Sequence, residues 1–267
     1  MYITYWGTAA AEGVPAIFCE CEFCRYARDA GGKEVRTRSG SLIDGRLKLD
    51  FGPDSYMQSL KFNQSLAPVE HILITHSHHD HFCPEDIDYI RKPFGHRDAK
   101  LHVYGNAKVE AGIAPFLNER HLDFTRVEPF KTYQIDEYAV TPLQAVHCVG
   151  TDEEPLFYLI EKDGKSLLYG LDTDLFTEAD WEFLKGRRMD LVTLDCTNGI
   201  LDPRWLGHMG IRKNLDTRRR MLEEGIADEK TVFVANHFSH NGLIPYEGLQ
   251  KLLPGFTVAY DGLTMLV

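Results

Sequence analysis

Long apolar runs are missing from this chain of 267 residues. No stretch approaches the roughly 20 apolar residues that a membrane-spanning helix needs. The first residues, Met1–Gly7, have neither a basic start nor an apolar run, so they do not resemble a signal peptide. The sequence therefore predicts a cytoplasmic protein with no membrane partner.

Basic charge is also scarce. The chain has 29 Lys and Arg residues against 40 Asp and Glu residues, which gives a formal net charge of −11. This balance repels nucleic acid at long range and makes it a poor candidate partner. The basic residues between Arg212 and Arg220 are followed by Glu223 and Glu224, so they are interpreted as a solvated helix face.

Repeats, low-complexity segments and linkers rich in Pro, Gly or Ser are absent as well. A hydrophobic share of 43 % supplies a sizeable core, and a chain of 267 residues is within reach of one large sandwich domain. We therefore expect a single domain over residues 1–267. The oligomeric state stays open, with a homodimer as one option.

Short apolar runs bounded by turn residues alternate with fewer amphipathic stretches, which indicates a mixed chain of strands and helices. Strands are predicted at Ile3–Trp6, Leu47–Asp50, His71–Ile74, Leu101–Tyr104, Ala139–Leu143, Leu156–Ile160, Ser166–Tyr169, Leu191–Leu194, Thr231–Val234 and Thr257–Ala259. Helices are predicted at Ser55–Phe62, Ala107–Leu117, Glu178–Leu184, Leu215–Glu224 and Tyr246–Leu252. Thr177 and Asp180 are a candidate capping pair for the third helix.

Three of the six cysteines are crowded into Cys19-Glu20-Cys21-Glu22-Phe23-Cys24. They are too close for ordinary mutual disulfides, so a metal site is favoured, with a reactive thiol cluster as the alternative. Three thiolates leave a tetrahedral zinc one ligand short, and His240, three residues after His237, is a candidate for the fourth. The other cysteines are interpreted as small buried hydrophobic residues: Cys83, Cys148 and Cys196.

The segment His76-Ser77-His78-His79-Asp80-His81 is a dense group of potential metal ligands. It follows a predicted strand, and period-two alternation there turns His76 and His78 to the same side. Neutral imidazole and carboxylate are usual ligands of zinc, manganese or iron. A chance cluster among the 12 histidines is the alternative, and the regular spacing argues against it.

Further candidate ligands lie at other predicted strand ends: His147, Asp172 and His237 each follow an apolar run. Residues that end separate strands converge on one edge of a sheet, where a site stands on rigid supports. One structural zinc needs only four ligands, so this set is larger than one ion requires. The sequence therefore predicts two metal ions that share a carboxylate.

These residues resemble the signature of the metallo-β-lactamase superfamily, whose fold is a four-layer αββα sandwich of the α/β (α+β) class with a dinuclear site at one edge. The resemblance covers nearly the whole chain, from the turn near Trp6-Gly7 to His237. It implies a first metal on His76, His78 and His147, a second on Asp80, His81 and His237, and a bridge at Asp172. The superfamily's flavodiiron oxygen reductases have Glu in place of His78, so the histidine favours hydrolysis over redox chemistry.

Within the superfamily the chain resembles the phosphoribosyl cyclic phosphate phosphodiesterases of phosphonate breakdown. The shared features include Gly13-Val14-Pro15, the cysteine cluster and Asp195-Cys196 after a strand. The resemblance implies a structural zinc in a loop at about 13–27, held by Cys19, Cys21, Cys24 and His240. It also implies that His208 contacts phosphate, although Gly207-His208-Met209-Gly210 departs from the family's usual loop. The pyrroloquinoline-quinone biosynthesis B proteins share the cysteines but generally lack the intact dinuclear set.

The predicted function is that of a metal-dependent phosphodiesterase acting on a small cyclic phosphate, with Asp80 and His208 as catalytic residues. The expected cofactors are two active-site ions, zinc or manganese with iron as a third option, and one structural zinc. The expected partner is a small phosphate ester. A lactone, ester or thioester hydrolase is the runner-up, and a non-hydrolytic metal-binding protein of the same fold is another alternative. A transfer-RNA maturation nuclease is disfavoured by the acidic charge.

Overall fold

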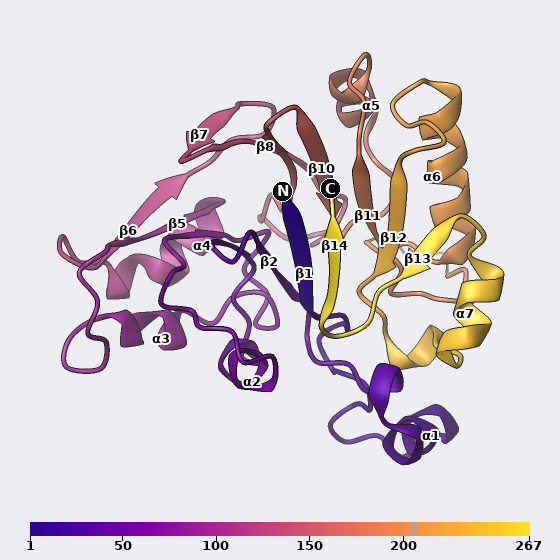
Figure 1. Ribbon diagram of the computed structural model, residues 1–267, viewed down its shortest axis with the longest axis horizontal. Helices are drawn as coiled ribbons and strands as arrows, with labels where there is room; N and C mark the ends of the chain where they lie inside the picture. Colours follow the sequence, from indigo (N-terminus) through magenta and orange to yellow (C-terminus); the bar gives the residue numbers. More distant parts are fainter. Residues whose placement is uncertain (204–206) are drawn as a thin grey trace.

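The computed structural model describes residues 1–203 and 207–267. Within these ranges two seven-stranded sheets are packed face to face (Figure 1). The first sheet contains, in spatial order, β14 (Leu263–Leu266), β1 (Tyr2–Gly7), β2 (Gly40–Ile43), β3 (Leu47–Leu49), β4 (His71–Leu73), β5 (Leu101–Gly105) and β6 (Leu122–Arg126). The second contains β13 (Phe256–Val258), β12 (Val232–Asn236), β11 (Leu191–Asp195), β10 (Lys165–Gly170), β9 (Leu156–Lys162), β8 (Tyr138–Gln144) and β7 (Tyr133–Ile135).

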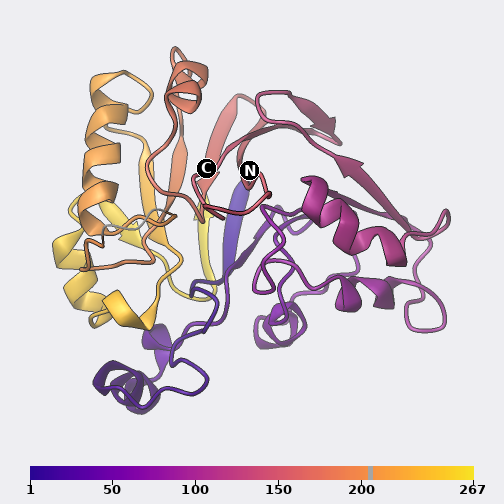
Figure 2. The same ribbon diagram turned by 180° about the vertical axis from the view of Figure 1, so that it is seen from behind.

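Helices flank the outer side of each sheet. Those beside the first sheet are α2 (Ser55–Lys61), α3 (Pro84–Ile87) and α4 (Ala107–Ile113). Those beside the second are α5 (Glu178–Leu184), α6 (Ile211–Glu223) and α7 (Tyr246–Leu252) (Figure 2). Helix α1 (Glu22–Ala30) lies below the sandwich in both views. The predicted αββα sandwich is therefore confirmed.

The main core fills the space between the sheets. It unites side chains such as Ile3 and Leu49 of the first sheet with Ile160, Leu167 and Val234 of the second. Alternate residues of each strand point the other way and form outer cores with the helices. Burial on both faces explains why several strands read as continuous apolar runs rather than as alternating patterns.

Parallel pairing sets the position of the site. β3 to β6 are parallel in the first sheet, and β10 to β13 are parallel in the second. In register, Leu49 of β3 lies opposite Leu73 of β4. The carboxyl ends of parallel neighbours lie at one edge of a sheet, so the polar residues that follow these strands are brought together.

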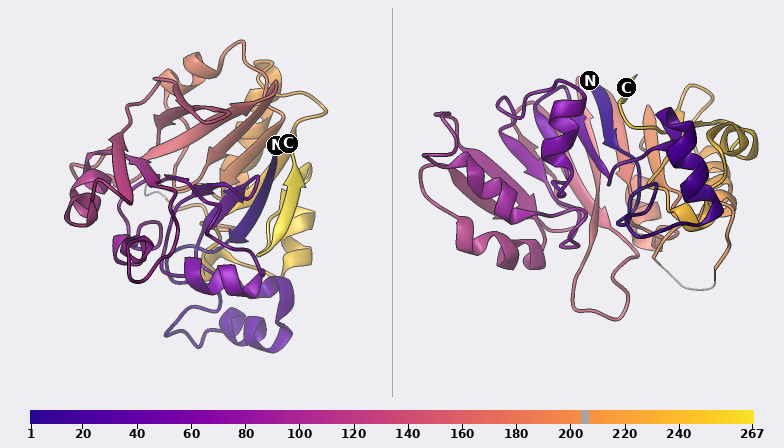
Figure 3. Two further views of the ribbon diagram at one scale, coloured as in Figure 1. Left: turned by 60° about the vertical axis from the view of Figure 1, so that its left-hand side comes forward. Right: turned by 90° about the horizontal axis from the view of Figure 1, so that it is seen from below.

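The two ends of the described chain are neighbours in the first sheet. β1 pairs with β14 in antiparallel register, Tyr2 opposite Leu266, and the two strands run side by side in both views of Figure 3. The amide of Val267 also donates to the carbonyl of Met1 at 3.0 Å.

All ten predicted strands are present, with bounds shifted by at most two residues. Four further strands, β2, β6, β7 and β14, and helices α1 and α3 had no predicted counterpart. The predicted helix at Leu215–Glu224 begins earlier, at Ile211, and the one at Ala107–Leu117 ends as a 3₁₀ turn, Ala114–Phe116. The Thr177–Asp180 pair forms a complete capping box. Among the described residues, no helix has the length and apolar character to cross a bilayer.

Candidate metal centre

The site lies at one edge of the sandwich, where strands of both sheets end. Four residues that follow these strands have positive φ angles: Asp50 (56°), Cys148 (52°), Asp172 (48°) and His237 (62°). This left-handed conformation is uncommon for residues other than glycine, and such outliers gather at functional sites. The chain therefore turns sharply at the strand ends and presents these side chains at the edge.

The three candidate ligands of the first metal lie together. The ring of His76 is 4.4 Å from that of His78 and 4.9 Å from that of His147, centroid to centroid. His147 Nε2 is 3.2 Å from His78 Nδ1. Separations of this size between nitrogens suit ligands that share one ion at the usual zinc–nitrogen distance of about 2.0–2.1 Å.

The candidate ligands of the second metal form an adjoining group. His81 Nε2 is 3.1 Å from Asp80 Oδ2 and 3.3 Å from His237 Nε2. Asp172 faces both groups, because its Oδ2 is 3.0 Å from His81 Nε2 and from His237 Nε2, while its Oδ1 is 3.7 Å from His147 Nε2. The structure thus brings all seven side chains to one place, with Asp172 between the two sets.

Four of the histidines are held through their outer ring nitrogens, Nδ1. The partners are Thr75 Oγ1 for His76 (2.9 Å), Asp50 Oδ2 for His81 (2.7 Å), the carbonyl oxygen of Gly207 for His147 (3.0 Å) and Thr197 Oγ1 for His237 (2.7 Å). Metal-binding histidines are usually anchored in this way, which fixes the ring and leaves the other nitrogen for the ion.

The donor set fits divalent metal ions. His76 Nε2 is buried and has no hydrogen-bond partner, and Asp172 Oδ2 has none of proper geometry. Burial holds the pKa of His76 well below its usual value, so this nitrogen keeps its lone pair. Burial opposes ionisation of Asp172, but His237 and His81 outweigh it and hold the pKa of the carboxyl well below its usual value. A bound cation would satisfy both the unpaired lone pair of His76 Nε2 and the ionised carboxylate of Asp172.

Asp50 is a site residue that the sequence did not single out. Its Oδ1 accepts the amide of Thr75 at 2.8 Å, while Oδ2 lies against His81 Nδ1. One fully buried carboxylate therefore supports the backbone before His76 and orients His81. The signal that could have identified Asp50 was its position as the polar last residue of the predicted strand at Leu47–Asp50.

Asp50→Asn is expected to lower the affinity for the second metal by about 10- to 100-fold, because the amide weakens the contact that orients His81. Isothermal titration calorimetry, in which metal is added to chelator-treated protein, measures this affinity. The matched control is Asp44→Asn, in the β2–β3 turn at the far end of β3, where the carboxylate binds Tyr138 and Lys162. Equal metal affinity in the two variants would contradict the role of Asp50.

His208 lies beside the metal candidates. Its Nδ1 is 2.9 Å from Asp195 Oδ2 and 3.9 Å from Asp172 Oδ1, and its ring is stacked on that of His237 with centroids 5.8 Å apart. Burial disfavours its protonation, but Asp195 outweighs this and raises the pKa of His208 to about 9. Asp195, the last residue of β11, thus fixes an imidazole at the rim of the site.

The predicted cysteine site is also assembled. The sulfurs of Cys19, Cys21 and Cys24 lie 3.6, 3.6 and 3.5 Å from His240 Nδ1. Hydrogen bonds from His240 and from the Cys24 amide lower the pKa of Cys21 to about 6, which favours a thiolate. The segment at about 13–27 is a loop only as far as Cys21, whose sulfur caps α1 by accepting the Cys24 amide.

One short segment joins the two candidate sites. His237 faces the dinuclear group and His240, three residues later, faces the cysteines. Between them, Ser239 Oγ donates to Glu12 Oε1 at 2.6 Å, which ties this segment to the N-terminal loop. Four residues of backbone therefore connect the cysteine group to the wall of the dinuclear group.

The other cysteines differ from one another. Cys83 and Cys196 are buried, as the sequence predicted. Cys148 is only partly buried and lies in a group with His76, His78 and His147, so its assignment as a buried hydrophobic residue was wrong. Sequence alone could not show this, because the side-chain direction depends on the left-handed backbone at Cys148.

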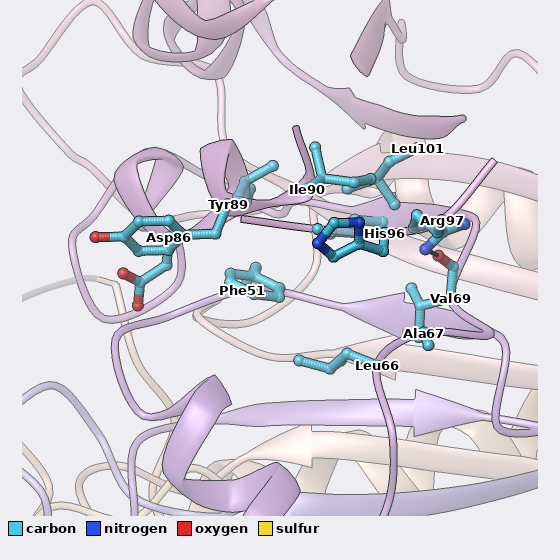
Figure 4. A pocket seen from close by; sticks show the side chains of 13 residues that line it. Phe51, Leu66, Ala67, Val69, Asp86, Tyr89, Ile90, His96, Arg97 and Leu101 are labelled. Carbon is cyan, nitrogen blue, oxygen red and sulfur yellow. Dashed lines mark hydrogen bonds between the residues drawn. The ribbon is translucent and has the colours of Figure 1, made fainter. Parts of the chain in front are cut away.

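A separate cavity of about 300 Å³ lies away from these ligands. Its wall is mainly apolar, with Phe51, Leu66 and Val69 on one side, and His96 and Arg97 lie near one end (Figure 4). None of the seven candidate dinuclear ligands lines it. We therefore assign it no part in the chemistry of the site.

Comparison with known proteins relates the fold to solved structures. Residues 46–237 match the family model of the beta-lactamase superfamily domain. No curated protein matches the chain. A diphosphatase from the PhnP family is 22 % identical with a TM-score of 0.80, over 100 % of this chain and 97 % of its own.

Two further structures share the fold. Zinc-bound PqqB from Methylobacterium extorquens is 20 % identical with a TM-score of 0.78, over 100 % of both chains. The short form of human tRNase Z is 16 % identical with a TM-score of 0.69, over 100 % of this chain and 99 % of its own. At these identities the likeness is one of fold.

Proposed function

Because the chain belongs to the metallo-β-lactamase superfamily of metal-dependent hydrolases, we propose that its site holds two divalent ions and cleaves a small cyclic phosphodiester. The observation that carries the proposal is the position of Asp172, whose two oxygens face two separate groups of ligands. His208 beside it adds a cationic group at the rim.

The two ions are assigned to the ligand sets already described. His76, His78 and His147 would hold the first, Asp80, His81 and His237 would hold the second, and Asp172 would contribute to both. Bound there, the ions would lower the pKa of an attacking water and offset negative charge on the phosphoryl oxygens. Asp80 is the most exposed of the three proposed ligands of the second ion, and its Oδ2 is 3.1 Å from His81 Nε2. Its removal would deprive the second ion of one ligand.

His208 is placed to contact the phosphate of a bound substrate. Asp195 binds its Nδ1, which leaves Nε2 as the nitrogen that can reach a substrate. In the protonated form, Nε2 donates a hydrogen bond to a phosphoryl oxygen or a proton to the leaving sugar hydroxyl. A carboxylic ester does not need such a donor, so this residue favours the phosphodiester over the ester alternative.

The charge of the chain favours a small substrate. A net charge of −11 repels a long polyanion before it reaches the site. A strained cyclic phosphate of a sugar or nucleotide carries a single negative charge and fits a compact group of ligands. We therefore place the substrate among small cyclic phosphates rather than among nucleic acids.

Turnover of bis-p-nitrophenyl phosphate and of 2′,3′-cyclic nucleotides is the expected result, with manganese at least as effective as zinc. His208→Ala is expected to lower kcat by about 10²-fold or more, with a smaller change in KM, because its contact strengthens as charge builds on phosphorus. The control is His102→Ala, a histidine of β5 at the opposite edge of the sheet, which should leave both constants unchanged. Robust lactone or thioester hydrolysis, with no phosphodiester cleaved under any metal, would overturn the proposal.

A further inference from the structure

Cys148 occupies an unusual place at the candidate first metal. It follows His147 directly and has a positive φ of 52°. Its sulfur is 3.7 Å from His78 Nε2 and 3.9 Å from Glu153 Oε2. Of the three cysteines outside the N-terminal cluster, it alone belongs to a group of potential ligands among the described residues.

The group has the dimensions of a four-donor metal site. The Cys148 sulfur and one ring nitrogen each from His76, His78 and His147 all lie within 4.8 Å of one another. An independent observation points to a cation at the same place, because His76 Nε2 is fully buried and has no hydrogen-bond partner. Three nitrogens and one sulfur therefore lie close enough together to share one ion.

We infer that Cys148 is a further protein ligand of the first ion, beside His76, His78, His147 and the bridging Asp172, an inference that rests on the proposed dinuclear site. On coordination a metal–sulfur bond forms, the S–H bond breaks, and the proton leaves to solvent. Zinc binds thiolate readily, and together with three imidazoles and the Asp172 carboxylate the sulfur would leave this ion no open position. The hard ion manganese favours oxygen donors and gains little from sulfur.

This ligand makes the first ion's coordination depend on which metal is bound. With zinc, the thiolate would fill the position that otherwise receives water or substrate, and a site closed by protein ligands is typical of structural rather than catalytic zinc. With manganese, the thiol stays off the ion and the position is open. Cys148→Ser is therefore expected to raise the ratio of zinc-supported to manganese-supported activity severalfold.

Cobalt(II) spectroscopy tests the ligand directly. Wild-type chain, Cys148→Ser and Cys83→Ser are each loaded with cobalt, and the near-ultraviolet thiolate-to-cobalt absorption is compared per bound ion. The cysteine site on residues 19, 21 and 24 contributes equally in all three, so the difference reports Cys148. Wild type and Cys83→Ser should share an additional band that Cys148→Ser lacks, while visible cobalt absorption from the histidine site persists in all.

The outcomes separate this inference from the proposed function. Identical near-ultraviolet spectra with visible bands from the histidine site would overturn the role of Cys148 and leave the dinuclear site standing. Absence of cobalt from the histidines in every chain would overturn the proposed function itself.

Alkylation of the wild-type chain provides a second test that needs no variant. Mass spectrometry should show Cys148 protected from iodoacetamide by zinc and unprotected with manganese. Equal alkylation of Cys148 under both metals would refute the inference.

Discussion

Asp172→Ala is expected to lower phosphodiester turnover by at least about 10²- to 10³-fold while the chain stays folded, the loss seen when one preorganised electrostatic group is removed from a site. The carboxylate lies between both sets of ligands, so its loss would remove a bond to each of the proposed ions. Without it the histidines also lose the charge that favours a cation among them. Steady-state kinetics with bis-p-nitrophenyl phosphate, together with metal content, measures the effect.

Asp174→Ala is the matched control, since both carboxylates are nearly fully buried and only two residues apart. Asp174 binds Lys213 Nζ at 2.6 and 2.8 Å and belongs to none of the metal groups. Its removal leaves the partly buried ammonium of Lys213 without its partner, so stability should fall by roughly 3 kcal/mol. Turnover below the melting temperature should change little. If Asp174→Ala lost as much activity as Asp172→Ala, the assignment of Asp172 as the bridge would be wrong.

Cys21→Ser should produce the largest loss of stability. Structural zinc contributes to folding directly, on the order of 10 kcal/mol in small zinc domains, so even a partly retained ion should leave a deficit of several kcal/mol. In a chain of this size each kcal/mol corresponds to a fall of about 2–4 °C in Tm. Calorimetry of the purified variant, combined with zinc analysis, should show both the lower Tm and the lost ion.

Two other variants complete this test. Cys83→Ser removes a buried thiol outside the metal groups and should cost about 1 kcal/mol. Asp80→Ala removes a proposed ligand from the dinuclear site and should reduce activity with little change in Tm. A melting temperature lower for Asp80→Ala than for Cys21→Ser would show that the structural and catalytic assignments are reversed.

The sequence could predict the parts of the site that are local. His76, His78, Asp80 and His81 lie within six residues, and their spacing at a strand end is visible without a structure. The cysteines of the candidate structural zinc site are equally close together in the sequence. His240 could be identified because it lies three residues after His237. The more distant ligands were recognised because each one ends an apolar run.

The rest depends on pairing between segments that are far apart in the chain. The role of Asp50 exists only because β3 lies beside β4 in parallel register, which brings the carboxylate to Thr75 and His81. The role of Cys148 depends on a backbone angle that no residue pattern encodes. Short strands such as β7, with three residues, are stabilised by their neighbours rather than by their own composition.

The pairing of β14 with β1 has a consequence for how the chain is made. β1 is synthesised long before residues 263–266, its partner on one side, so that edge of β1 stays unpaired until they emerge. Bare strand edges recruit strands of other chains, and contacts of such long sequence separation form slowly. A nascent chain, or one cleaved before Leu263, is therefore the form most prone to aggregate. By pairing with β1, strand β14 keeps the edge of β1 from pairing with other chains.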